Sequence, residues 1–174
     1  MSLADDVADP HGALLELYER SLGDVYGYLA RRCPNATTAE DLTAETFLAA
    51  VRAVRAGNAD VSIPWLIGTA RHKLVDHWRR EGRQREALDD LYGATEVVDN
   101  NDPIEALHVH TVLSQLPPHH RAALTLRYLD GLPVEQVAAH LERSVHATES
   151  LLIRAKASYR SACPSAHDDH GGLS

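Results

Sequence analysis

Apolar residues recur along this 174-residue chain at the three- and four-residue spacing of amphipathic helices, without the strict alternation of a half-buried strand. The first such stripe lies in residues 11–32 and consists of Leu14, Leu17, Tyr18, Leu22, Val25 and Leu29. Six further helices are predicted, at residues 37–55, 62–80, 103–115, 118–129, 133–141 and 145–161. The pattern therefore predicts an all-α protein.

Turn and capping residues set the expected helix boundaries. Cys33 precedes a proline, and a residue in that position avoids the helical region, so the first helix is expected to end there. Thr37 and Glu40 have the spacing of a capping box and are expected to begin the second helix. Ser62 is expected to cap the third helix, with Pro64 in its first turn.

The apolar stripes also predict which helix faces are buried. In the second helix the residues expected to point inward are Ala44, Phe47, Leu48, Val51 and Val54. In the third helix they are Ile67, Ala70, Leu74 and Trp78. The opposite faces carry charge, which by itself indicates only a solvated surface.

Charge divides the chain further, although its net value is −8. Residues 71–85 hold six basic and two acidic residues, whereas residues 86–105 hold seven acidic residues and no basic one. The acidic stretch has weak periodicity and is expected to form a flexible linker. We therefore predict two small helical domains, residues 11–81 and 103–161, joined by a linker at residues 82–102, with disordered tails at 1–10 and 164–174.

The last third of the chain has the pattern of a helix-turn-helix. Its first helix has one apolar stripe (Val134, Val137, Ala138 and Leu141), and its turn contains Glu142 and Arg143. Ser144 is expected to cap a second helix whose inner face holds Val145, Thr148, Leu152, Ala155 and Tyr159. Its outer face holds His146, Ala147, Ser150 and Arg154, as in a helix that enters the DNA major groove. An ordinary αα-hairpin is the alternative.

Two earlier segments, residues 41–50 and 64–80, resemble the characteristic region 2 helices of the sigma-70 family, and the helix-turn-helix stands where that family has region 4. The short linker resembles the extracytoplasmic-function (ECF) type of bacterial sigma factor. The resemblance covers roughly residues 11–161. It implies a non-catalytic subunit that directs promoter-specific transcription initiation. The implied partners are core RNA polymerase, through its β′ clamp helices and β flap, promoter DNA and an anti-sigma factor.

The resemblance also implies site residues. Those facing polymerase are Asp41, Glu45 and Arg52. Those facing the −10 element are Asn58, Asp60, Trp65, Thr69, His72, Lys73, Asp76, Arg79 and Arg80, and a pocket for an extruded base would be formed by residues 58–61. Those facing the −35 element are Arg143, His146, Ala147, Ser150 and Arg154. Trp65 is equally well explained by packing.

The chain departs from the family pattern at three positions. His72 stands where many relatives have Asn, so the −10 preference does not carry over. Glu149 and Leu151 stand where relatives often carry cations. Losing two phosphate contacts is expected to weaken electrostatic attraction to DNA and flatten its salt dependence.

Other classes of protein find little support in the sequence. No catalytic constellation, metal-ligand spacing or cofactor motif is present, and the absence of a signal peptide and of an apolar span favours the cytoplasm. Cys33 and Cys163 are expected to be thiols, although a redox or zinc role stays open. Two alternative functions also stay open: a free-standing helix-turn-helix regulator, and an interaction module that sequesters another factor.

Overall fold

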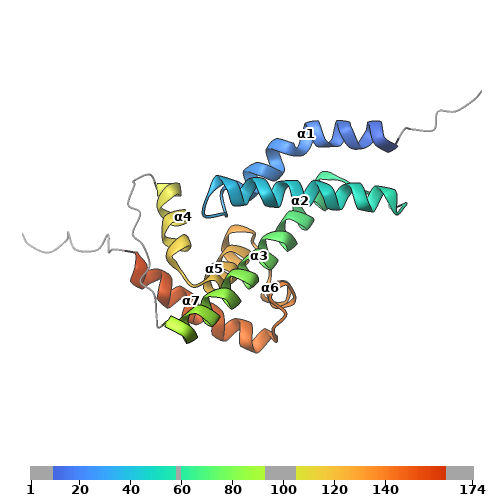
Figure 1. Ribbon diagram of the computed structural model, residues 1–174. Coiled ribbons are helices and arrows are strands. Elements are labelled where there is room, and N and C mark those ends of the chain that lie inside the picture. The colour runs from blue at the N-terminus through green and yellow to red at the C-terminus, as the bar shows by residue number, and fades with distance from the viewer. Residues whose placement is uncertain (1–9, 58–59, 93–104, 164–174) are drawn as a thin grey trace, which may run out of the picture. The chain divides into compact units, whose positions relative to one another are not determined.

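The computed structural model describes residues 10–57, 60–92 and 105–163 of the chain (Figure 1). Every regular element in these ranges is a helix, which confirms the all-α prediction. The α-helices are α1 (Pro10–Ala30), α2 (Ala36–Arg55), α3 (Ile63–Tyr92), α4 (Glu105–Gln115), α5 (Pro118–Leu124), α6 (Val134–Leu141) and α7 (Val145–Ala162), and a π-helical turn, η1, covers Thr125–Leu129. The chain forms two compact units, one ending at Asp76 and the other beginning at His77.

Helices α1 and α2 lie side by side in the first unit (Figure 1). Val25 and Leu29 of α1 are completely buried, as their places in the predicted apolar stripe require. Near the other end of α1, the ring of Tyr18 meets that of Phe47 edge to face, with 4.7 Å between ring centroids. Aromatic contacts of this geometry add to the free energy gained by burying the rings.

The second helix begins earlier than predicted. Asn35, with extended backbone dihedrals, is its N-cap, and the Asn35 side chain accepts a hydrogen bond of 2.8 Å from the backbone N–H of Thr38. The prediction that Thr37 and Glu40 form the cap is therefore wrong. Asparagine is among the best N-cap residues, and its position directly after Pro34 lets the helix start as soon as the chain has turned.

The buried face of α2 also differs from the prediction. Ala44 is exposed and Leu48 has 53% of its surface exposed, whereas the buried residues are Ala39, Leu42, Thr43, Thr46, Phe47 and Ala50. The two threonines are buried because their hydroxyls donate to helix carbonyls, Thr43 to Ala39 and Thr46 to Leu42, both at 2.7 Å. A threonine whose hydroxyl is hydrogen-bonded can take the place of an apolar residue in a core. A prediction that considers only apolar residues does not detect such positions.

Helix α3 starts as predicted but ends later. The backbone N–H of Trp65 donates to the Ser62 hydroxyl at 3.4 Å, which confirms the cap. Its buried residues include Leu66, Val75 and the predicted Ala70, Leu74 and Trp78, while Ile67 is only half-buried. The predicted end near Arg80 is wrong, because α3 continues to Tyr92 and includes the first half of the predicted linker. Residues 81–92 contain no proline and are rich in Glu, Arg, Ala, Leu and Gln, which favour helix without any apolar periodicity.

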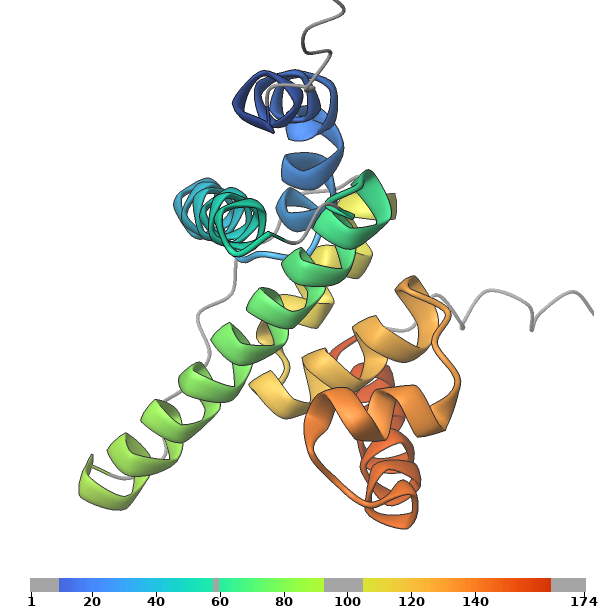
Figure 2. The same cartoon turned by 90° about the vertical axis from the view of Figure 1, so that its right-hand side faces the viewer.

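The second unit contains the predicted helix-turn-helix and the two helices before it. Figure 2 shows α6 and α7 beside α5, and α4 also contacts α7. Leu113, Leu116, Leu124 and Ala155 form the core that joins α4, α5 and α7. One predicted helix, residues 118–129, is divided in two, because α5 gives way at Thr125 to the π-helical turn η1. A turn at Gly131, with a φ of 68°, then leads into α6.

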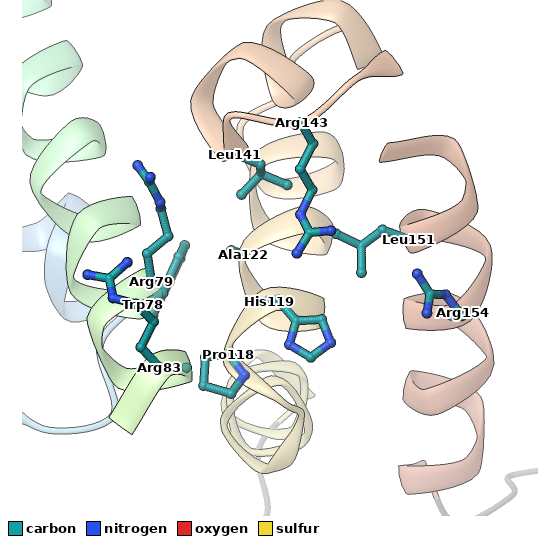
Figure 3. Close-up of a pocket in the computed structure, with 11 residues that line it drawn as sticks. Trp78, Arg79, Arg83, Pro118, His119, Ala122, Leu141, Arg143, Leu151 and Arg154 are labelled. Carbon is teal, nitrogen blue, oxygen red and sulfur yellow. The ribbon is translucent and has the colours of Figure 1, made fainter. Parts of the chain in front are cut away.

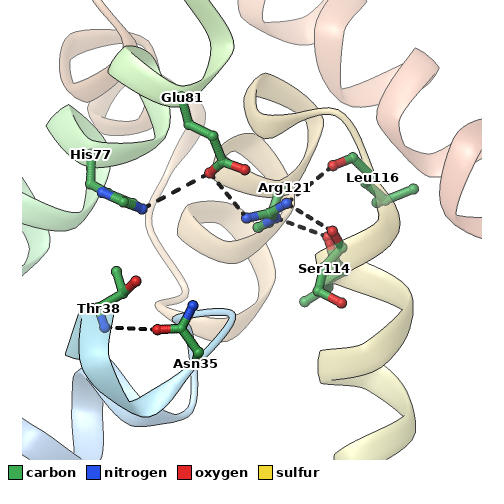
Figure 4. A network of polar contacts seen from close by, with 8 residues as sticks. Asn35, Thr38, His77, Glu81, Ser114, Leu116 and Arg121 are labelled. Carbon is green, nitrogen blue, oxygen red and sulfur yellow. Dashed lines mark hydrogen bonds and ion pairs between the residues drawn. The ribbon is translucent and has the colours of Figure 1, made fainter. Parts of the chain in front are cut away.

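Arg121 of α5 fastens the end of α4 (Figure 4). Only 4% of the residue is exposed, and its guanidinium donates to the carbonyls of Leu113 at 3.0 Å and Ser114 at 2.8 Å. These carbonyls belong to the last turn of α4, where no further helical N–H can reach them. Glu81 of α3 lies 3.4 Å from the same guanidinium and balances its charge. Arg121 therefore joins α3, α4 and α5 within this unit.

Several predicted features lie outside the described residues. They are most of the N-terminal tail (residues 1–9), the second half of the linker (93–102), the start of the fourth helix (103–104), the C-terminal tail (164–174) and, in the loop before α3, Asn58 and Ala59. The two-domain boundaries at residues 81 and 103 stay a prediction.

Candidate nucleic-acid and polymerase interfaces

The predicted polymerase-facing residues share one side of α2. Asp41, Glu45, Leu48 and Arg52 follow one another at spacings of four, three and four residues, so they stack along one stripe of the helix. We call these four residues the α2 outer face. Asp41, Leu48 and Arg52 are exposed, and Glu45 is half-buried. An exposed leucine between acidic and basic side chains is typical of a docking surface, where an apolar contact adds affinity and charges set the register.

Glu45 of this face is paired with a residue predicted for a different role. Its carboxylate lies 3.4 Å from Nζ of Lys73 on α3, and both side chains are partly exposed. The pair links a predicted polymerase contact to a predicted DNA contact inside the first unit. Partly exposed pairs of this kind contribute only about 0–1 kcal/mol to stability. Lys73 therefore remains available to exchange this partner for a phosphate.

The predicted −10 residues within the described chain belong to α3 and the loop before it. Asp60, His72, Asp76 and Arg80 are exposed, and the half-buried members are Trp65, Thr69, Lys73 and Arg79. Asn58 lies outside the described residues, as does Ala59 of the predicted base pocket. Trp65 follows the Ser62 cap by three positions and is half-buried. Half-burial agrees with both interpretations of Trp65.

The helix-turn-helix has the predicted turn. Glu142 adopts the left-handed conformation with a φ of 52°, which ends α6 and turns the chain toward α7. The Ser144 side chain then accepts a hydrogen bond of 3.2 Å from the N–H of Ala147, as expected of an N-cap. Val137, Ala138 and Leu141 are buried, which confirms three of the four residues of the predicted stripe on α6. Val134 is only half-buried.

The outer side of α7 carries the predicted −35 residues. Arg143, His146 and Arg154 are exposed, and Ala147 and Ser150 are half-buried. Two predictions about this helix are wrong. Val145, expected in the core, has 40% of its surface exposed, because it stands in the first turn at the edge of the unit. Leu151, one of the two positions where relatives often carry a cation, is only 1% exposed, so it does not belong to the outer side.

Arg79 is engaged within the second unit. Its Nη1 donates to Oε1 of Glu142 at 2.9 Å, and its Nη2 donates to Oε2 of the same carboxylate. These hydrogen bonds, together with the charges of Arg79 and Arg83, lower the pKa of Glu142. A predicted −10 contact is thus joined to the turn between the two helices of the helix-turn-helix.

Sequence reasoning missed a basic cavity in this unit, lined from α3, α5, the α6–α7 turn and α7 (Figure 3). Arg83 and His119 line it together with the predicted DNA contacts Arg79, Arg143 and Arg154. The only signal in the sequence was the basic composition of residues 71–85, which does not indicate that arginines from separate helices converge.

The described residues hold no group of three or more His, Cys, Asp or Glu side chains arranged to bind a metal ion. Cys33 is buried, and neither it nor Cys163 is in a disulfide. Within the same ranges, no helix is long and apolar enough to cross a membrane.

Comparison with known proteins agrees with this architecture. The sequence matches the family patterns Sigma-70 region 2 over residues 17–84 and Sigma-70, region 4 over residues 107–158. It is 30% identical over 145 residues to the ECF RNA polymerase sigma factor SigM of Bacillus subtilis (strain 168), which covers 81% of this chain and 89% of that protein. It is 33% identical over 131 residues to the RNA polymerase sigma factor CarQ of Myxococcus xanthus, which covers 73% and 75% of the two chains.

A solved structure has the same fold. The sigma factor RpoE from Bartonella quintana, crystallised with the anti-sigma factor NepR, superposes with a TM-score of 0.53 and 17% sequence identity over 86% of this chain and 96% of that one. The region 2 match includes the α2 outer face and most of α3, and the region 4 match includes the helix-turn-helix. The chain therefore belongs to the sigma-70 family, as an ECF-type sigma factor that binds core RNA polymerase and directs promoter-specific transcription initiation.

Proposed function

We propose that the α2 outer face docks on the β′ clamp helices of core polymerase. Asp41 is exposed and acidic, and Leu48, about two turns further along, offers an apolar side chain that the fold leaves uncovered. Complementary charge would set the register of docking, and burial of Leu48 would add affinity. Glu45 would take part by exchanging Lys73 for a basic partner residue.

For the −10 element, α3 and the loop before it provide the contact surface. Exposed His72 and Arg80 and half-buried Trp65 and Lys73 combine an aromatic ring with cations, as is usual where proteins bind unpaired bases and their phosphates. Asp60, Thr69, Asp76 and Arg79 complete the predicted set. Glu142 competes with a phosphate for Arg79, because the carboxylate accepts from both terminal nitrogens of the guanidinium.

For the −35 element, α7 serves as the recognition helix. The observation that carries this proposal is its orientation in the unit. Ser144 caps the helix, Thr148, Leu152 and Ala155 are buried on its inner side, and the N-terminal part of the outer side is left to His146, Ala147 and Ser150. The N-terminal residues of a recognition helix are those that reach base edges in the major groove. Arg143 and Arg154 stand before and after this segment and are suited to phosphate contacts.

Run-off transcription with purified core polymerase tests the whole assignment. The expected result is initiation at specific start sites that requires both this chain and its promoter. Binding to duplex DNA without initiation would indicate a free-standing regulator. Neither activity, with capture of another sigma factor instead, would indicate a sequestering module. A charge reversal of Glu19, an exposed acid on α1 outside the predicted sites, provides a matched control for substitutions on the α2 outer face.

We further infer that this chain acts in the cytoplasm, has no catalytic activity of its own and needs no cofactor, because polymerase supplies the chemistry. An anti-sigma factor is proposed as its inhibitor, by analogy with the B. quintana structure, in which a sigma factor is bound by one. Co-purification of a partner that blocks run-off transcription, and that core polymerase displaces, would identify it.

A further inference from the structure

The cavity in the second unit contains an unusual concentration of positive charge. It has a volume of about 290 Å³ and is lined by eleven residues, four of which are arginines: Arg79, Arg83, Arg143 and Arg154. None of the eleven is acidic. Figure 3 shows Arg143 reaching from the α6–α7 turn toward His119, while Arg154 approaches from α7. The four arginines come from three segments of the chain, with Arg79 and Arg83 on the α3 side of the cavity and Arg143 and Arg154 on the other.

Arg83, Arg143 and Arg154 are exposed, so solvent screens much of their repulsion, but together they raise the local attraction for an anion. One carboxylate, that of Glu142, is bonded to Arg79 at the edge of the cavity and neutralises one of the four arginines. Arginine is the side chain best suited to phosphate, because its planar fork donates two parallel hydrogen bonds to two phosphate oxygens. Arg83, Arg143 and Arg154 thus present more donors than the protein groups around them accept.

The inner wall of the cavity is apolar. Trp78, Ala122 and Leu151 each have about 1% of their surface exposed, and they lie behind the arginines. The Trp78 indole N–H is buried and has no hydrogen-bond partner among the described residues. A hollow with a buried apolar wall and a rim of exposed polar groups has the construction of a small-molecule site.

We propose that this cavity binds the phosphates of a small phosphorylated molecule, of the size of pyrophosphate or the phosphate chain of a nucleotide. The volume is just below the usual range for drug-sized ligands, about 300–1,000 Å³, and accommodates a phosphate chain more readily than a whole dinucleotide. Arg143 and Arg154 donate to the phosphate oxygens, Arg83 adds positive charge from the α3 side, and Trp78 lies beside them. Glu142 competes with the ligand for Arg79.

The ligand would occupy two residues that the proposed function assigns to the −35 element, Arg143 and Arg154. A phosphorylated small molecule in the cavity would therefore compete with promoter DNA for the same guanidinium groups. This consequence rests on the proposed function, but binding itself does not. Binding is measured on the full chain without polymerase or promoter, so either idea can fail alone.

The test is titration of the full chain with inorganic pyrophosphate at constant ionic strength, with binding measured by calorimetry. Tryptophan fluorescence of a Trp65→Phe chain, in which Trp78 is the remaining tryptophan, provides a second measurement. Saturable binding of one pyrophosphate per chain is expected. Arg83→Gln is the informative variant, because Arg83 has no proposed polymerase or DNA contact, and loss of its charge beside the cavity should weaken binding several-fold. Arg83→Lys keeps the charge and should recover part of the loss. Arg85→Gln, with the same charge change on α3 but outside the cavity, should have little effect.

Three results would overturn the proposal. One is no saturable binding of pyrophosphate at millimolar concentration to a chain whose helical melting transition is intact. Another is equal weakening by Arg83→Gln and Arg85→Gln, which would indicate general charge attraction. The third is tight binding of a random-sequence duplex that pyrophosphate does not displace, which would make the arginines a DNA surface only.

Discussion

Arg79 and Glu142, 63 positions apart in the sequence, form a two-point ion pair, in which Nη1 of Arg79 donates to Oε1 at 2.9 Å and Nη2 donates to Oε2. The pair connects α3 to the left-handed residue that ends α6. Arg79, a residue on which the predicted function draws, is therefore held next to a carboxylate. The Glu142 carboxylate partly offsets the positive charge of Arg79.

Glu142→Gln is predicted to strengthen binding of the chain to duplex DNA. Removing the carboxylate leaves the Arg79 guanidinium able to contact a phosphate, so the slope of log Kobs against log salt should steepen by about 0.9. The fold should be little affected, because Glu142 is exposed. The measurement is DNA affinity at several salt concentrations. Glu135→Gln removes an exposed acid from α6 and is the control, and equal slopes for the two variants would contradict the prediction.

The sequence was sufficient to predict most of the helices. Their apolar periodicity and the caps Ser62 and Ser144 are local features, and local features appear directly in the sequence. Burial of Thr43 and Thr46 was not predictable from apolar counting, because it depends on hydroxyls that bond to their own helix. The continuation of α3 past Arg80 rests on helix propensity without periodicity.

The missed site residues have a different cause. Arg121 and Glu81 are 40 positions apart, and the arginines of the cavity come from three separate segments of the chain. Nothing local marks such residues, because only the packing of the helices brings them together. Predicted DNA contacts such as Arg154 were easier to name, since they depend on one helix and its resemblance to a family pattern.

Arg121→Met is predicted to destabilise the second unit by about 2–4 kcal/mol. Methionine fills much of the same space but leaves the carbonyls of Leu113 and Ser114 and the Glu81 carboxylate without their donor. The free energy of unfolding is measured with urea. Arg127→Met is the control, because Arg127 is less buried and donates a hydrogen bond to the Leu132 carbonyl at 3.0 Å. Equal costs for the two variants would show that Arg121 does not fasten α4.

Stability is predicted to fall in mildly acidic solution because of His120. Burial, and then the charges of His119 and Arg154, lower the pKa of His120. The folded chain therefore keeps this ring neutral below about pH 6.5, where the unfolded chain takes up a proton. The neutral His120 ring therefore makes its full contribution to the free energy of unfolding above about pH 6.5. This contribution is lost as the pH falls from there toward the lowered pKa of His120 in the folded state.

The corresponding experiment compares urea unfolding between about pH 7.5 and pH 5 in the parent chain, in His120→Phe and in His146→Phe. His120→Phe removes the titrating group from a buried position and should flatten the pH dependence. His146 is exposed, so His146→Phe should leave the slope as in the parent. A slope that His120→Phe does not change would assign the effect to other groups.

Asp41→Arg is predicted to weaken binding to core polymerase at least several-fold without changing the melting temperature. Asp41 is exposed on the α2 outer face, and reversing its charge would oppose basic groups on the partner. Glu45→Arg is a less direct test, since it also breaks the pair with Lys73. Affinity for core polymerase is compared with that of Glu19→Arg on α1. Unchanged affinity in Asp41→Arg would rule out this docking face.

The recognition helix gives the sharpest contrast, between two neighbouring positions where relatives often carry cations. Glu149 is exposed, so Glu149→Lys should strengthen binding to DNA and steepen its salt dependence by about one unit of slope or more, with the fold intact.

Leu151→Lys should do the opposite. Leu151 is 1% exposed, and replacing it removes apolar packing and buries an ammonium group, at a cost of about 3–5 kcal/mol. Leu151→Met keeps the volume and should cost less than about 1.5 kcal/mol. Thermal melts and DNA titrations of Glu149→Lys, Leu151→Lys and Leu151→Met test whether Leu151 packs in the core or faces DNA. A Leu151→Lys chain that melts like the parent and binds DNA more tightly would place Leu151 on the DNA side of α7 and refute the packing described above.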